Sequence, residues 1–109
     1  MEKLNLITRL LEEKKAEDIK VLDVSKATNI ADHFVIASAN SPVHARALAQ
    51  YLSEKLEEKG WKPDHIEGYE FGNWILLDLI DVIVHIFTPQ WREMYGLDWI
   101  WSESVREEK

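Results

Sequence analysis

A chain of 109 residues with a formal net charge of −7 is long enough for one domain with one modest core. Lysine and arginine are scattered and cysteine is absent, so we expect no disulfide, no thiolate chemistry and no direct binding to DNA or RNA. No apolar run reaches the roughly 18 residues of a membrane span, and the N-terminus matches neither a secretory signal nor a transit peptide. We therefore expect a cytoplasmic domain whose acidity either keeps it soluble or steers it onto a basic protein partner.

The first half of the chain predicts two helices and two strands. Apolar residues recur at helical spacing near the N-terminus, and two apolar, β-branched runs follow. Ser41-Pro42 is typical of a helix start. Gly60 is typical of a helix end at which Trp61 packs against Leu56. The predicted elements are a helix at 3–15, strands at 19–24 and 33–39, and a helix from Ser41-Pro42 to Gly60.

The second half predicts a hairpin between two shorter elements. The predicted elements are a short strand at 66–69, hairpin strands at 74–78 and 81–87, and a helix at 89–95. Residues 102–109 form a polar tail that we expect to fray. Three helices interleaved with about five strands predict the α/β (α+β) class, with one domain over 1–109 and a mixed sheet flanked by helices.

The hairpin, GNWILLDLIDVIVHIF from Gly72 to Phe87, is the longest apolar run and the only one that holds a tryptophan, two aspartates and a histidine. Side chains alternate across a strand, so a two-residue loop at Leu79-Ile80 divides the run into two faces. On the first face the expected opposite pairs are Trp74 with His85, Leu76 with Ile83, and Asp78 with Asp81. The second face is purely aliphatic, so we expect it to lie under helices. Its members are Ile75, Leu77, Val82, Val84 and Ile86.

Asp78 and Asp81 are the best candidates for chemistry. Two carboxylates facing across a hairpin can hold Mg²⁺ or share a proton, but phosphoryl transfer also needs a phosphate-binding loop or a cationic clamp, and neither is visible. Both residues equally suit a tight turn, which is the interpretation that we favour. No serine has the context of a nucleophile, and no two histidines have the spacing of a helical metal site. We therefore expect no catalytic residue, no metal and no cofactor.

Aromatic residues are frequent, with five tryptophans in the chain. Trp91, Trp99 and Trp101 crowd the C-terminal segment around Tyr95. Tryptophan and tyrosine anchor protein interfaces because they bury a large area and keep a polar group. These four residues are therefore candidates for an interface between two copies of the chain, and a plain dimerisation module is one interpretation of the sequence.

Three motifs make the chain resemble the Iojap/RsfS family of ribosomal silencing factors. They are I-A-D-x-F-V-I-A from Ile30, W-x-L-L-D-x-x-D-V-x-V-H-x-F from Trp74 and R-E-x-Y-x-L-x-x-x-W from Arg92. The similarity covers roughly residues 4–103, and the three motifs in this order are specific.

The resemblance implies a translation factor that is not an enzyme. Family members bind the large ribosomal subunit through ribosomal protein L-fourteen, block joining of the small subunit and repress translation when nutrients run short. Their fold is similar to that of nucleotidyltransferases, and free members have been seen as homodimers. A nucleotidyltransferase-like protein that binds metal and nucleotide is the alternative that this fold suggests.

The family's partner-binding hairpin carries over onto Trp74, Asp78 and Asp81. The alternation of side chains extends the same face to Leu76 and His85. One departure stands at the tip, because the family usually has glycine where this chain has Ile80. Glycine tolerates the positive φ of a tight hairpin turn, and a β-branched residue does not.

Overall fold

The computed structural model describes residues 1–97 and 106–108. These residues form a mixed sheet with strand order β3-β4-β5-β2-β1-β6, in which β2 and β5 are parallel and the other neighbours are antiparallel. The elements are α1 (Glu2–Glu13), β1 (Glu17–Asp23), β2 (His33–Ser38), α2 (Pro42–Glu58), β3 (His65–Glu67), β4 (Trp74–Asp78), β5 (Val82–Phe87), α3 (Pro89–Tyr95) and β6 (Arg106–Glu108). The predicted class, a mixed sheet flanked by helices, is confirmed.

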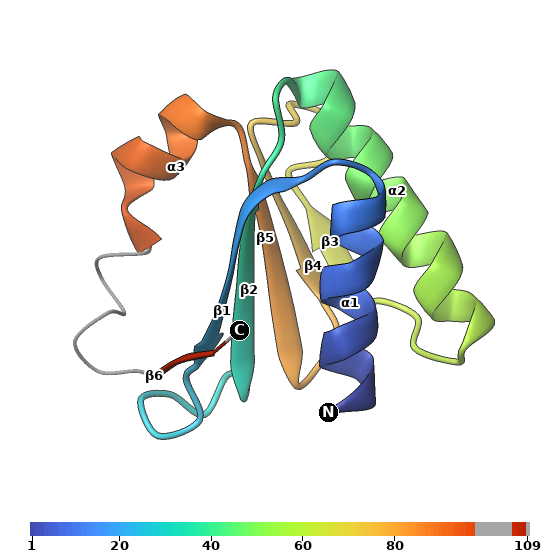
Figure 1. Ribbon diagram of the computed structural model, residues 1–109, viewed down its shortest axis with the longest axis vertical. Helices are drawn as coiled ribbons and strands as arrows, with labels where there is room; N and C mark the ends of the chain where they lie inside the picture. The colour runs from blue at the N-terminus through green and yellow to red at the C-terminus, as the bar shows by residue number, and fades with distance from the viewer. Residues whose placement is uncertain (98–105, 109) are drawn as a thin grey trace.

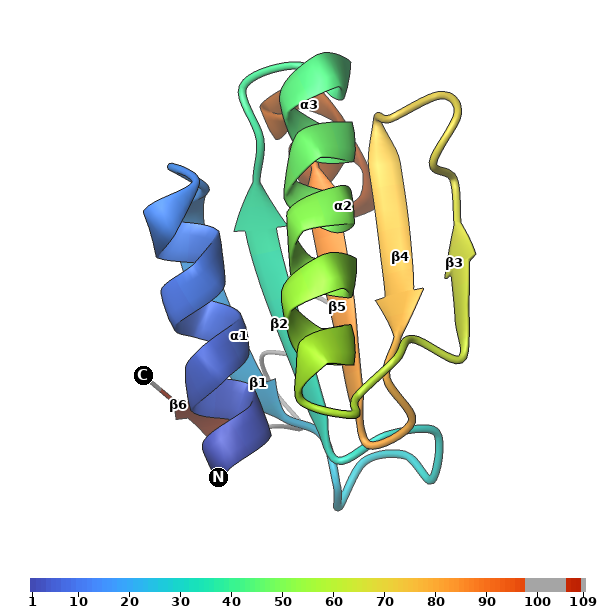
Figure 2. The ribbon, with the colours of Figure 1, turned by 90° about the vertical axis from the view of Figure 1, so that its right-hand side faces the viewer.

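The two faces of the sheet are covered unequally. Helices α1 and α2 lie side by side on one face, and the shorter α3 stands on the other (Figures 1 and 2). The side chains under α1 and α2 form the larger core, and Leu11, Leu52 and Ile75 are among its fully buried members. Burying such a side chain stabilises the fold by roughly 1.5–3 kcal/mol, so this face supplies most of the hydrophobic stabilisation.

Helix α2 begins and ends as its sequence predicts. The hydroxyl of Ser41 accepts a hydrogen bond from the amide of His44 at 3.1 Å, and Pro42 occupies the first turn. At the other end Gly60 has a φ of +84°, and the amide of Trp61 donates to the carbonyl of Leu56 at 2.9 Å. This is the hydrogen bond of a Schellman motif, which ends the helix and turns the chain towards β3.

A smaller core lies beneath α3. It is built around Leu22, Phe34, Ile36 and Phe87, with Trp91 partly buried against it. Helix α3 itself has no fully buried residue. On this face of the sheet, Trp74 and Leu76 are only half-buried.

The C-terminal segment was expected to fray, but residues 106–108 pair with β1 as the antiparallel strand β6. Pairing with an edge strand satisfies backbone groups whatever the side chains are, which is why a polar sequence gives no sign of it. Trp99 and Trp101, two of the four candidates for an interface between copies, lie outside the described residues. No described helix is both long and apolar enough to cross a membrane.

Candidate docking face

The hairpin has the predicted division into two faces but a different register. Trp74 pairs with Phe87, Leu76 with His85, and Asp78 with Ile83. The register differs from the prediction by two residues, and an even shift leaves the side chains of both strands, Trp74–Asp78 and Val82–Phe87, on their predicted faces. The aliphatic face is confirmed, since all five of its members are buried under α1 and α2. The other face, called the open face below, consists of Trp74, Leu76, Asp78, Ile83, His85 and Phe87.

The register differs because the loop consists of Ile80 and Asp81, and Ile80 has a φ of +76°. The amide of Asp81 donates to the carbonyl of Leu79 at 3.0 Å, which closes a three-residue γ-turn around Ile80. The Ile80 amide donates to Asp78 Oδ1 at 2.9 Å and helps to hold this conformation. A β-branched residue at positive φ costs about 1–3 kcal/mol. The tight turn is therefore made without glycine, at a cost in strain.

Asp81 does not face Asp78, contrary to the predicted pairing. Its carboxylate binds Lys3 Nζ at 2.7 Å, and the same Nζ donates to the carbonyl of Leu79 at 3.1 Å. The carbonyl of Asp81 accepts hydrogen bonds from the amides of Asp32 and His33 at 2.8 and 3.1 Å. Asp81 thus ties the hairpin tip to α1 and to the loop before β2. This arrangement leaves no pair of carboxylates across the hairpin for a shared metal ion or a shared proton.

His85 lies on the open face but is 95% buried, with an exposed fraction of only 5%. Its Nδ1 accepts a hydrogen bond from Trp74 Nε1 at 3.1 Å, and Phe34 packs edge-on against its ring. Because the indole N–H only donates, Nδ1 carries no proton and the neutral ring is protonated at Nε2. Burial lowers the pKa of His85 from 6.5 to about 4, which keeps the ring neutral. The buried His85 therefore fixes the orientation of the half-exposed Trp74 through this hydrogen bond.

Trp74 is the centre of a row of aromatic rings that joins the sheet to α3. Its ring centroid lies 5.0 Å from that of Phe87 and 4.5 Å from that of Tyr95, and Tyr95 stacks on Trp91 at 5.5 Å. Tyr95 is 41% exposed, and Trp74 and Trp91 are half-buried. Such a row is stiff and apolar and has one solvent-facing side, as an anchor for a protein partner requires.

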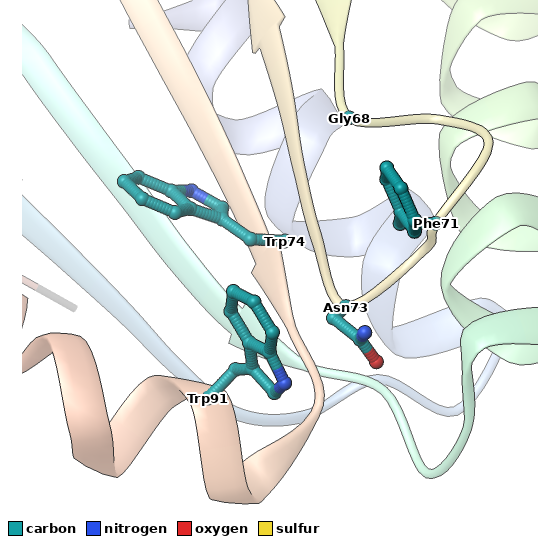
Figure 3. Close-up of a pocket in the computed structure, with 5 residues that line it drawn as sticks. All are labelled: Gly68, Phe71, Asn73, Trp74 and Trp91. Atoms are coloured by element: carbon teal, nitrogen blue, oxygen red, sulfur yellow. The ribbon is translucent and has the colours of Figure 1, made fainter.

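Beside this row lies a pocket of about 450 Å³, lined by Gly68, Phe71, Asn73, Trp74 and Trp91 (Figure 3). Phe71 is 83% exposed, which is exceptional for so large an apolar side chain. Phe71 and Phe87 were not among the residues predicted for this site. The signal for Phe71 was available, because an aromatic residue next to Gly72 in an irregular segment has no strand or helix to bury it.

The position of α3 over the sheet depends on Arg92. Its Nη1 donates to Ser38 Oγ at 2.8 Å and to the carbonyl of Asp18 at 2.7 Å. Gly96, with a φ of +64°, ends the helix and donates its amide to the carbonyl of Arg92. These bonds hold Trp91 and Tyr95 beside Trp74.

The acidic edge of the open face is formed by β3 and β4. Asp78 and Glu67 lie there with His65, which is the residue paired with Asp78. The pKa of His65 is raised above 6.5, mainly because it is hydrogen-bonded to Glu67 and also because Asp64 and Asp78 lie close by. One group of side chains in the described residues has ligand atoms close enough together for a metal ion, and it consists of Asp64, His65 and Asp78.

A single sheet sealed on one side by two helices, with an aromatic row and an acidic edge on the other, is typical of a small binding protein. The same fold occurs in the crystal structure of a Chromobacterium violaceum protein, with a TM-score of 0.90 and 36% identity, covering 93% of this chain and 84% of that one. The family model described as "Ribosomal silencing factor during starvation" matches residues 1–109. The chain belongs to this family, RsfS.

Two relatives illustrate the range of the similarity. The chain is 36% identical over 103 residues to the ribosomal silencing factor RsfS of Halalkalibacterium halodurans, with 94% of this chain and 88% of that protein covered. It is 29% identical over 102 residues to a mouse protein named "Mitochondrial assembly of ribosomal large subunit protein 1", with 91% of this chain and 45% of that protein covered.

Proposed function

We propose that this chain binds the large ribosomal subunit through ribosomal protein L-fourteen, blocks its association with the small subunit and thereby represses translation when nutrients are limiting. The factor acts in the cytoplasm by occupying a surface and not by catalysis. The observation that carries the proposal is the half-exposed Trp74, held in place by His85 and flanked by exposed aromatic rings. Family membership and the name of the mouse relative support a large-subunit partner.

The geometry favours different roles for the five predicted contact residues. Trp74, Leu76 and Asp78 are half-buried and present their side chains on the open face, so they are the direct contacts. His85 is buried and supports Trp74, while Asp81 is engaged by Lys3 at the tip. In this proposal Trp91 and Tyr95 extend the direct contact from α3, because their rings continue the row that starts at Trp74.

Charge favours a basic partner. The chain carries a net charge of −7, and Glu67 and Asp78 lie at the edge of the open face. Complementary charge accelerates encounter and suppresses wrong partners more than it adds affinity. A ribosomal protein surface rich in lysine and arginine fits this edge, with the aromatic row supplying the buried anchor.

The test is binding to purified large subunits, measured by co-sedimentation over a concentration series. Trp74→Ala is expected to weaken binding by at least about 30-fold, since a central aromatic anchor contributes about 2 kcal/mol or more. The matched control is Tyr51→Ala, which removes a half-buried ring on the α1/α2 side of the molecule. If wild-type protein does not bind, or if Trp74→Ala binds as wild type does, the proposal fails.

A charge reversal tests the acidic edge separately. Asp78→Lys is expected to weaken binding and to flatten its dependence on salt, whereas Glu54→Lys on the exposed side of α2 is expected to do neither. Equal effects of the two substitutions would mean that only the net charge matters and would remove Asp78 from the site.

We also propose that two copies of the free chain meet through the C-terminal aromatic residues, of which Trp91 and Tyr95 lie in α3 beside the open face. Sedimentation equilibrium over a concentration series tests this, with Tyr95→Ala expected to shift the equilibrium towards monomer. A wild-type monomer at every concentration would refute the homodimer and leave ribosome binding untouched. The nucleotidyltransferase-like alternative loses its main support, because Asp81 pairs with Lys3 and not with Asp78.

A further inference from the structure

A histidine and two aspartates converge where β3 meets β4. His65 is paired directly with Asp78 in the antiparallel ladder, so the two side chains lie on the same face of the sheet. Asp64 precedes His65, and its amide donates to the carbonyl of Asp78 at 2.7 Å, which fixes the backbone of the connection against β4. The three side chains come from two separate segments, and backbone hydrogen bonds determine how far apart they lie.

The distances within this group suit one small cation. His65 Nδ1 lies 3.7 Å from Asp64 Oδ2 and 3.6 Å from Asp78 Oδ2. Ligand atoms of the three residues all lie within 4.8 Å of one another. In a tetrahedral zinc site with bonds of about 2.0–2.1 Å, neighbouring ligand atoms are about 3.4 Å apart. The two distances from the imidazole therefore need to shorten by only a few tenths of an ångström.

Two further contacts orient the ligands. His65 Nε2 lies 2.8 Å from Glu67 Oε2, so the nitrogen that points away from the two aspartates is already held by a carboxylate. Metal-binding histidines usually have this arrangement, in which the second ring nitrogen donates to a carboxylate and the first is left free for the metal. Asp78 Oδ1 accepts the amide of Ile80 at 2.9 Å, which leaves Oδ2 to face His65.

We propose that Asp64, His65 and Asp78 bind a divalent transition-metal ion, with Zn²⁺ the best match, and that Glu67 positions the imidazole. One nitrogen and two carboxylate oxygens are ligands that Zn²⁺ accepts, and three protein ligands leave a fourth position for water. The hard cation Mg²⁺ prefers oxygen ligands alone in octahedral geometry, so the imidazole disfavours it. All three ligands can be reached from solvent, with side chains 24–61% exposed.

The test is calorimetric titration of the full chain with ZnCl₂, after treatment with chelator and in a buffer that does not bind zinc. Wild type is expected to bind one ion per chain. His65→Ala is expected to abolish saturable binding, and Asp64→Asn to weaken it by at least tenfold. Glu67→Gln is expected to weaken it by about 10- to 100-fold, the usual effect of losing a carboxylate behind a histidine ligand.

His44→Gln is the matched control, because His44 lies in the first turn of α2 and bonds to Asn40 and Lys14. It is expected to bind Zn²⁺ as wild type does. Circular dichroism of each variant without metal shows whether the fold is intact, and these residues are exposed enough for substitutions to be tolerated. No saturable binding by wild type, or equal binding by wild type and His65→Ala, would overturn the proposal. Neither result bears on the ribosome, so the two proposals fail separately.

Discussion

The two faces of the hairpin share one backbone but differ in what covers them. The face towards α1 and α2 is aliphatic and fully buried, whereas the open face has aromatic rings, an acid and a buried histidine under a short helix. Because side chains alternate along a strand, each residue step moves the side chain between the buried face and the open face, where we propose that the partner binds. Neighbours such as Ile75 and Trp74 should therefore respond to substitution in different assays, the first in stability and the second in binding.

The largest expected difference between the faces is in stability, and two leucines on opposite sides of the sheet measure it. Leu52→Ala removes a side chain with no exposed surface from the core under α2 and is expected to lower the free energy of unfolding by about 2–5 kcal/mol. Leu76→Ala on the open face starts from a half-buried side chain, so we expect a loss at the bottom of that range or below it. Urea unfolding measures the loss in free energy for both variants. A larger loss for Leu76→Ala than for Leu52→Ala would contradict the expected difference between the two faces.

The buried histidine makes the open face sensitive to acid. Its folded pKa of about 4 lies below the 6.5 of the unfolded chain, so the unfolded state binds more protons between these values. Stability is therefore lost as the pH falls from 6.5 towards 4, by up to about 3 kcal/mol from this group. Urea unfolding at several pH values is expected to show a flatter profile for His85→Leu than for wild type. Profiles that stay parallel would show that His85 is not the group responsible.

The smallest expected effect is at the hairpin tip, and it has the opposite sign. Ile80→Gly relieves the strain of positive φ, and this gain is offset by the extra freedom of glycine in the unfolded chain, so we expect a gain of about 1 kcal/mol. Gly60→Ala is the converse control, because it adds a Cβ at a residue with a φ of +84°. No atom lies within 4 Å of that Cβ, so the substitution tests backbone strain without a steric clash. That variant is expected to lose about 1–2 kcal/mol. Thermal unfolding measures both, and a loss for Ile80→Gly would contradict the strain argument.

Features that depend on local chemistry could be predicted from the sequence. The start of α2 at Ser41 and its Schellman end at Gly60 are each decided by a few adjacent residues. The division of the hairpin into two faces also follows from the alternation of side chains, and it was correct even though the register was not. Moving the two-residue loop by one position changes the pairing register by two residues, and a register error of an even number leaves each strand side chain on its face.

Features that depend on distant partners could not be predicted. The register is a local exception, because it followed from a γ-turn at Ile80, and a β-branched residue on its own disfavours the positive φ of that turn. Asp81 was assigned to the open face because nothing in the sequence connects it to Lys3, which lies 78 positions earlier. His85 has the polarity of a surface residue, and its burial depends on the ring of Phe34 and the indole of Trp74, which come from other strands.

The contact between Lys3 and the hairpin tip also bears on the order in which the molecule folds. Lys3 and Asp81 lie 78 positions apart, so the contact between them closes a loop that contains most of the chain. Contacts of this kind form after most of the chain has collapsed and are weakly developed in the folding transition state. Lys3 should therefore act mainly on the rate of unfolding and hardly on the rate of folding. During synthesis, Lys3 in the first turn of α1 leaves the ribosome long before Leu79 and Asp81. The contact between α1 and the hairpin tip can therefore form only after the hairpin has emerged.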